Sequence, residues 1–151
     1  YQYLFDALYT NTIEADKIKG YYYLMEVYNH GQNPNSSIVS NLWNIAYRNI
    51  NKYNMLIKYS KESKHDWFKK YEYFLRVYRA YEYLNMANLW GDVALVTEPV
   101  DVNNPYYSRT SVDKVFDFVI SELEEAYKFL PEENNQLFCS KYLAKAIQAK
   151  A

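Results

Sequence analysis

Three carboxylates close together in the chain are the residues most able to do acid–base chemistry. Glu122, Glu124 and Glu125 could supply the pair of carboxyl groups that glycoside hydrolysis requires. They are predicted to lie on the helix face opposite its apolar stripe, where acidic side chains are normally solvated. The sequence also contains no glycine-rich phosphate loop and no nucleophile elbow. We therefore expect that the chain is not an enzyme.

Metal and disulfide chemistry are poorly supported as well. His30 and His65 have no His or Cys companion at ligand spacing, so we expect no metal site and no cofactor. Cys139 is the single cysteine, which excludes a disulfide within the chain. We expect this residue to be a small packing side chain.

Aromatic residues are abundant, with 19 Tyr, 7 Phe and 3 Trp among 151 residues. A flat ring with a polar tip suits partly wet packing between helices, and it also suits stacking against a sugar ring. Packing is the commoner role for any single tyrosine. The composition alone leaves both uses open.

Charge and hydropathy narrow the class of protein. The 17 Lys and Arg against 18 Asp and Glu leave a net charge of -1, which gives no field for holding nucleic acid. No apolar run reaches the roughly 18 residues that cross a bilayer. Because the chain begins at Tyr1 rather than Met, and Ala151 lies inside a helical pattern, we expect a piece of a longer protein.

Helices must position these side chains, because only three Gly and four Pro interrupt apolar residues spaced three and four apart. We expect one all-α domain over residues 1–151, with little or no β-structure. Capping residues predict helix starts at Asn11, Ser36 or Ser37, Asp66, Thr110 or Ser111, and Ser140. Stop signals follow the first, third and fourth helices at Gly31, Gly91 and Pro131.

The same spacing predicts which faces are buried. The second helix has an apolar face of Ile38, Leu42, Ile45, Ala46, Asn49, Tyr53, Leu56 and Ile57, and a second stripe of Trp43, Tyr47, Ile50 and Asn54. The third helix has a stripe of Trp67, Tyr71, Phe74, Tyr78, Tyr81, Asn85 and Asn88. The fourth helix has Val112, Val115, Phe116, Val119, Leu123, Ala126, Tyr127 and Leu130. Residues 93–96 are predicted to be a short extended run.

Helices of these lengths, joined as antiparallel neighbours, are typical of a TPR-like helical-repeat array. No clean 34-residue period with repeated consensus residues is present. The repeat interpretation therefore depends on the architecture.

Four stretches carry motifs in a particular order and spacing. They are Trp43, Tyr47, Ile50 and Asn54; Arg79-Ala80 with Gly91-Asp92-Val93; Arg109 to Val112 with Val115 to Ile120; and the small-residue segment from Ser140 to Ala151. Together they resemble the N-terminal portion of the SusD/RagB family of outer-membrane nutrient-binding lipoproteins. The chain departs from the family in having Ala94 where proline is usual and a short interval from Gly20 to Trp43.

This resemblance implies a right-handed, SusD-like helical-repeat fold and a role in polysaccharide utilisation. The family captures a nutrient, usually an oligosaccharide, on the outer-membrane surface and delivers it to a TonB-dependent SusC-like transporter. It also implies a lipid-bearing cysteine upstream of this chain as the only membrane attachment, and several hundred further residues beyond Ala151.

Sugar binding of this kind would use exposed aromatic rings flanked by polar side chains. The candidates are Asn33 and Asn35 in an early polar loop, Trp67 at a helix start, and Tyr106 and Tyr107 before Arg109. Each has a plainer alternative, since Trp67 begins a core stripe and the two tyrosines can cover a connection between helices.

A second class of function stays open beside glycan binding. A helical-repeat array can also act as a scaffold whose only ligand is another protein. Binding of an oligosaccharide would favour the first function, and binding of a partner protein without any glycan would favour the second.

Overall fold

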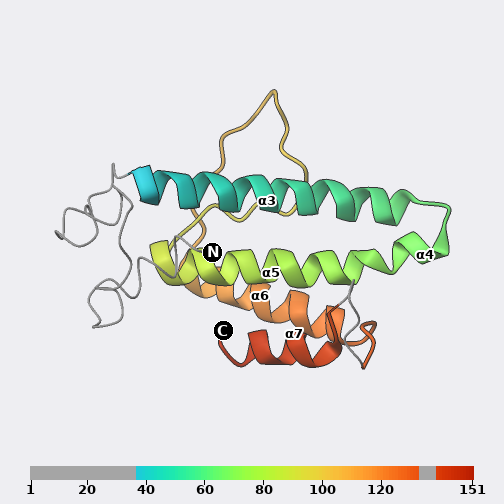
Figure 1. The fold of residues 1–151 in the computed structure, drawn as a ribbon. Coiled ribbons are helices and arrows are strands. Elements are labelled where there is room, and N and C mark those ends of the chain that lie inside the picture. Colours follow the sequence, from blue (N-terminus) through green and yellow to red (C-terminus); the bar gives the residue numbers. More distant parts are fainter. Residues whose placement is uncertain (1–36, 133–138) are drawn as a thin grey trace, which may run out of the picture. The chain divides into compact units, whose positions relative to one another are not determined.

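The computed structural model describes residues 37–132 and 139–151, and these residues form an all-α fold (Figure 1). The chain divides into two compact units, residues 1–45 and 46–151. The predicted first helix, from Asn11 to Gly31, lies outside the described residues. The predicted fold class is confirmed, whereas the grouping of residues 1–151 into one domain stays a prediction.

Helix α3 runs from Ser37 to Glu62 and begins at one of the two predicted capping serines. In the second unit its buried stripe consists of Ala46, Ile50, Asn54, Ile57 and Ser60. The stripe combines Ala46 and Ile57 of the first predicted face with Ile50 and Asn54 of the second. Leu56, which was predicted to be buried, is 41% exposed because it lies one residue, or about 100°, around the helix from Ile57.

The predicted third helix is two helices in the structure. Helix α4 (Asp66–Lys69) and helix α5 (Tyr71–Trp90) are separated at Lys70. The prediction that Asp66 caps this helix is wrong, because His65 occupies the N-cap position and Asp66 is the first helical residue. A carboxylate in the first turn still interacts favourably with the helix dipole.

Helix α5 buries a different face from the one predicted. Its buried side chains are Phe74, Val77, Arg79, Ala80, Glu82, Tyr83, Leu84, Met86 and Ala87. Tyr78 is 39% exposed, and Asn88 is exposed as well. Val77, Ala80 and Tyr83 are each 0% exposed, and Phe74 is the one residue of the predicted stripe that is buried on this helix.

Gly91 ends α5 as predicted, with a φ of 67° and its N–H donating to the carbonyl of Ala87 at 2.9 Å. Val93 then pairs with Thr110 in an isolated antiparallel bridge. The carboxylate of Asp92 accepts a 2.9 Å hydrogen bond from the N–H of Val112. A residue at the end of α5 thereby satisfies a backbone donor in the first turn of α6.

The extended segment of residues 93–100 is held by polar side chains of α3 and α5. Tyr47 donates from its hydroxyl to the carbonyl of Ala94 at 2.9 Å. The hydroxyl of Tyr83 donates to the carbonyl of Val96 at 2.9 Å and accepts from its N–H at 2.7 Å. Burial of this phenol raises the pKa of Tyr83 above its ordinary value, so it stays a hydrogen-bond donor.

Two asparagines of α3 complete this anchoring. Asn54 donates from its amide to the carbonyls of Val96 and Glu98, both at 2.9 Å. Asn51 accepts from the N–H of Val100 at 2.9 Å. After the bridge at Val93, several backbone groups of the segment are thus satisfied by side chains.

Helix α6 (Val112–Tyr127) packs against α5 and against α7 (Lys141–Gln148), with neighbouring helices antiparallel in Figure 1. The predicted core of α6 is confirmed at Val115, Val119, Leu123 and Ala126, each 1% exposed or less. Cys139, as predicted, is a buried free thiol. Across residues 37–132 and 139–151, no helix is long and apolar enough to cross a membrane.

Candidate ligand-binding site

Trp67 lies on α4, the four-residue helix that links α3 to α5, and its exposed fraction is 61%. No side chain of α4 is buried. The prediction that Trp67 begins a core stripe is therefore wrong. The alternative prediction, that it is an exposed ring at a helix start, agrees with its exposure.

Neighbouring aromatic rings support the Trp67 ring from the protein side. Its centroid lies 6.0 Å from that of Tyr71 in an edge-on arrangement and 5.5 Å from that of Phe68. Tyr71 in turn makes an edge-on contact with buried Phe74 at 6.3 Å. Contacts of this geometry are each worth about 0.5–1.5 kcal/mol beyond area burial. Trp67 is thus an exposed ring that is joined to the core through other rings.

A hollow of about 310 Å³ lies among residues that are close to Trp67 in the sequence. It is lined by Lys61, Lys69, Lys70, Glu72 and Tyr73. Lys69 lies 3.0 Å from the carboxylate of Asp66, and Lys61 lies 3.8 Å from that of Glu72. Hydrogen-bond donors and an aromatic ring therefore surround the same space, which is the combination that sugar hydroxyls and ring faces require.

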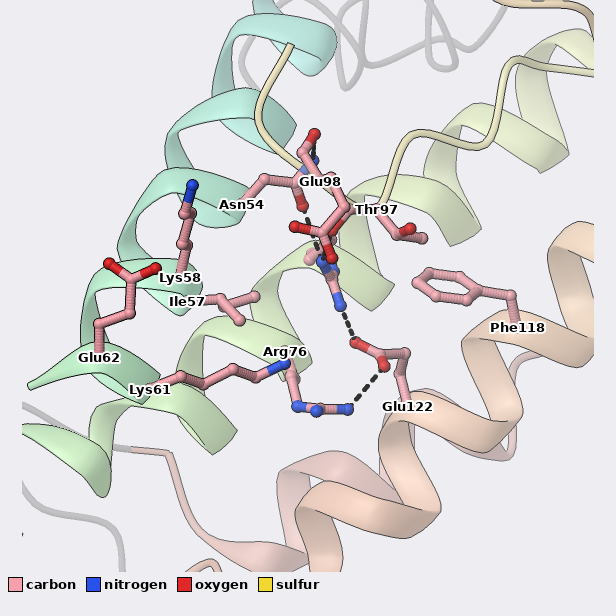
Figure 2. Close-up of a pocket in the computed structure, with 11 residues that line it drawn as sticks. Asn54, Ile57, Lys58, Lys61, Glu62, Arg76, Thr97, Glu98, Phe118 and Glu122 are labelled. Carbon is pink, nitrogen blue, oxygen red and sulfur yellow. Dashed lines mark hydrogen bonds and ion pairs between the residues drawn. The ribbon is translucent and has the colours of Figure 1, made fainter. Parts of the chain in front are cut away.

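A second cavity, of about 360 Å³, lies between α3, α5, α6 and the segment after α5 (Figure 2). Its lining residues are Asn54, Ile57, Lys58, Lys61, Glu62, Arg76, Arg79, Thr97, Glu98, Phe118 and Glu122. Lys61 also lines the 310 Å³ hollow, so the two spaces share one wall.

A buried ion-pair network forms the inner wall of this cavity. Glu122 pairs with both Arg79 and Arg76, and its contact with Arg76 is 2.8 Å long. A dashed line marks the pair of Arg76 and Glu122 in Figure 2. Arg76 also donates to Glu72 at 2.7 and 2.9 Å. Burial disfavours the charged guanidinium, but the two carboxylates outweigh that effect and raise the pKa of Arg76.

Arg79 connects this network to the extended segment. Its guanidinium donates to Asn54 at 2.7 Å and to the carbonyl of Thr97 at 2.9 Å. It also lies over the ring of Phe118, 5.5 Å from the ring centroid. Its side chain is 5% exposed, so Arg79 fixes the position of the cavity wall.

The prediction that Glu122 is solvated is wrong, because the residue is only 7% exposed and carries this network. The prediction of a solvated carboxylate agrees better with the other two residues, since Glu124 is exposed and Glu125 is half-buried and paired with Lys128. Opposite its apolar stripe, the face of α6 is not exposed to solvent at Glu122, because Arg76 and Arg79 of α5 pair with the Glu122 carboxylate. A pattern within one helix contains no information about charges on another.

The predicted sugar contacts do not form one cluster. Tyr106 is 88% exposed and Tyr107 is 43% exposed, both in the connection that rises beside the middle of α3, whereas α4 lies at the end of α3 (Figure 1). Asn33 and Asn35 lie outside the described residues. The structure therefore places Trp67 and the two tyrosines at separate positions.

Sequence reasoning missed the lysines that line the hollow after Trp67. Lys61, Lys69 and Lys70 lie in a stretch rich in charged and aromatic residues, and none of them was among the predicted contacts. All three are exposed in the structure. The density of lysines in this stretch was the available signal.

Comparisons with known proteins agree with the fold. Residues 2–151 match the model of the SusD-like family described as starch-binding and associating with the outer membrane. A crystal structure with xylogluco-oligosaccharide is 22% identical with a TM-score of 0.79, and it aligns with 96% of this chain and 30% of its own. No curated protein matches the chain.

Two further solved structures are similar at comparable levels. A laminarin-binding SusD-like protein is 23% identical with a TM-score of 0.75, over 84% of this chain and 29% of its own. Surface glycan-binding protein A from Bacteroides uniformis is 24% identical with a TM-score of 0.70, over 84% of this chain and 30% of its own. The chain thus spans about 30% of the length of these relatives.

The architecture first defines the class of protein, which is an all-α helical-repeat protein. Polar side chains hold the extended segment that follows α5. The match over residues 2–151 then shows the family, and the chain belongs to the SusD-like proteins. The resemblance found in the sequence motifs is confirmed.

Proposed function

We propose that this chain is part of a protein that binds an oligosaccharide at the bacterial outer-membrane surface. Three similarities support the proposal: the family description names starch binding and the outer membrane, and two related structures are described by a xylogluco-oligosaccharide and by laminarin. Under this proposal the bound glycan is delivered to a TonB-dependent SusC-like transporter, and a lipid outside this chain provides membrane attachment.

The observation that carries the proposal is the exposure of Trp67 on a helix that buries nothing. A large aromatic ring that contacts neighbouring rings and is 61% exposed is suited to stacking against the apolar face of a sugar ring. Binding and delivery require no covalent chemistry, so we propose no enzymatic activity. The carboxylate of Glu122 is engaged with Arg76 and Arg79 through its two oxygens and is not available for hydrolysis.

Calorimetric titration with a panel of oligosaccharides tests this function. The panel contains starch, xyloglucan and laminarin fragments together with acidic oligosaccharides. We expect at least one member to bind, and Trp67→Ala to weaken that binding by about 10- to 30-fold, the range for an aromatic residue that a bound ligand covers. Trp67→Phe should retain part of the affinity because it keeps a ring.

Tyr142→Ala provides a matched control, because Tyr142 is 59% exposed on α7 and lies outside the proposed site. Tyr106→Ala distinguishes the two predicted positions. If Tyr106→Ala abolishes binding and Trp67→Ala leaves it unchanged, the glycan binds at the loop of Tyr106 and not at Trp67. If no oligosaccharide binds while the protein captures a partner protein, the scaffold function replaces glycan binding.

A further inference from the structure

Positive charge is concentrated at the end of the molecule that carries Trp67. Residues 58–76 contain six Lys and Arg and three Asp and Glu, a net charge of +3, in a chain whose net charge is -1. The rest of the chain therefore has a net charge of -4. This stretch covers the end of α3, all of α4 and the start of α5, which adjoin each other in Figure 1.

The lysines of this stretch surround the hollow after Trp67. Lys61, Lys69 and Lys70 line it, and the one carboxylate among the lining residues belongs to Glu72. That carboxylate accepts two hydrogen bonds from Arg76, at 2.7 and 2.9 Å, whereas Lys61 is 3.8 Å away. Glu72 therefore neutralises Arg76 more than it neutralises the lysines.

Lys70 has no carboxylate of its own. In the part of the chain that the structure describes, its ammonium makes no ion pair, and the same is true of Lys58 in the adjoining cavity. Lys69 is the exception, since it pairs with exposed Asp66 at 3.0 Å. Among the described residues, Lys70 thus presents to the hollow an ammonium group without an ion pair, whereas the adjoining cavity is also lined by the carboxylates of Glu62, Glu98 and Glu122.

Like charges placed close together repel each other and oppose the folded state unless a counter-charge is bound. A neutral oligosaccharide supplies no such charge, because its hydroxyl groups are dipoles only. An anionic oligosaccharide supplies it at intervals along its chain, and exposed ammonium groups are suited to its carboxylate or sulfate groups as point charges.

On these grounds, and resting on the proposed function, we propose that the oligosaccharide bound at this end is anionic. One sugar ring stacks on Trp67, and a carboxylate or sulfate group of the same or the next sugar lies in the hollow at Lys70 and Lys61. Lys69 and Lys70 follow Trp67 within one helical turn, so a single ligand reaches both kinds of contact.

Titrations of the protein with three oligosaccharides of equal length test this inference. They are an oligogalacturonate with carboxylates, a carrageenan fragment with sulfate esters and no carboxylates, and a neutral laminari-oligosaccharide. We expect an anionic ligand to bind at least tenfold more tightly than the neutral one at low salt. The two anionic ligands show which anion is preferred. Raising NaCl from about 50 to 300 mM should weaken anionic binding, because exposed charge pairs are screened.

Lys70→Gln should weaken binding of the anionic ligand by about two- to fivefold, the range for one exposed charge pair. Lys70→Arg should keep the affinity because it keeps the charge. Lys114→Gln, at an exposed position on α6, is the matched control and should have no effect. Glutamine favours helices nearly as well as lysine, so neither change threatens the fold.

The outcomes separate this inference from the function on which it rests. If the neutral oligosaccharide binds as tightly as the anionic ones, and neither salt nor Lys70→Gln changes the affinity, the anionic preference is wrong while glycan binding stands. If none of the three ligands binds and the wider panel also gives no binding, both proposals are overturned.

Discussion

Replacing Glu122 by Gln tests the buried ion pairs between α6 and α5. The Glu122 side chain is 9% exposed and Arg79 is 5% exposed, so water cannot replace the lost charge. Breaking a buried ion pair by removing one partner costs about 3–5 kcal/mol of stability. We expect the lower end, about 3 kcal/mol, because Arg79 keeps its contacts with Asn54 and with the carbonyl of Thr97.

Urea unfolding at pH 7, followed by far-ultraviolet circular dichroism, measures this cost. With a slope of about 2 kcal/mol per molar urea, the unfolding midpoint should fall by about 1.5 M. The loss should persist at 0.5 M NaCl, since buried pairs are little screened. Asp117→Asn, at an exposed position of the same helix, should leave the midpoint nearly unchanged.

A double-mutant cycle resolves the two arginines. Glu122 should couple to Arg79 by more than about 1 kcal/mol. The coupling to Arg76 should be smaller, because Arg76 keeps Glu72 at 2.7 Å after Glu122 is changed. Equal midpoints for Glu122→Gln and Asp117→Asn, or a stronger coupling at Arg76, would refute the assignment of the network.

Two further predictions concern the backbone turn after α5 and the buried thiol. Gly91→Ala should cost about 1–3 kcal/mol in urea unfolding, because an added Cβ meets no atom within 4 Å and only the backbone conformation at φ 67° opposes it; an unchanged midpoint would contradict this. Burial raises the pKa of the Cys139 thiol to about 11, whereas an unfolded chain ionises near about 8.5. The unfolded state therefore loses its thiol proton first as the pH rises. The free energy of unfolding of the wild type relative to Cys139→Ala should fall as the pH increases from about 8.5 to about 11, and parallel pH profiles would contradict this.

Features that depend on neighbours in the chain could be predicted from the sequence. The buried face of α6 follows from its apolar spacing, and the positive φ of Gly91 follows from a glycine at the end of a helical pattern. Both depend on contacts within a few residues, or on conformational preferences of one residue.

Features that depend on distant residues could not be predicted in this way. Glu122 pairs with Arg79, 43 residues earlier, so its burial is set by α5 and not by its own helix. Trp67 is exposed on α4 although it continues the spacing of the predicted stripe, and no proline or glycine marks the boundary between α4 and α5 at Lys70. For the candidate site, the sequence predicted the aromatic residue Trp67 but not the lysines that line the hollow near it.

The high tyrosine content has a structural explanation that sharpens the role of Trp67. Tyr47 and Tyr83 use their hydroxyls to satisfy the backbone of residues 94–96, a task that phenylalanine could not perform. Those rings are needed for the fold, so changing them would confound stability with binding. Trp67 contacts rings on its inner side but lies on a helix that buries no side chain. Its removal should cost the ring contacts with Phe68 and Tyr71, about 1–3 kcal/mol together, but none of the hydrogen bonds that hold residues 94–96, so glycan binding by the folded variant can be tested at this residue.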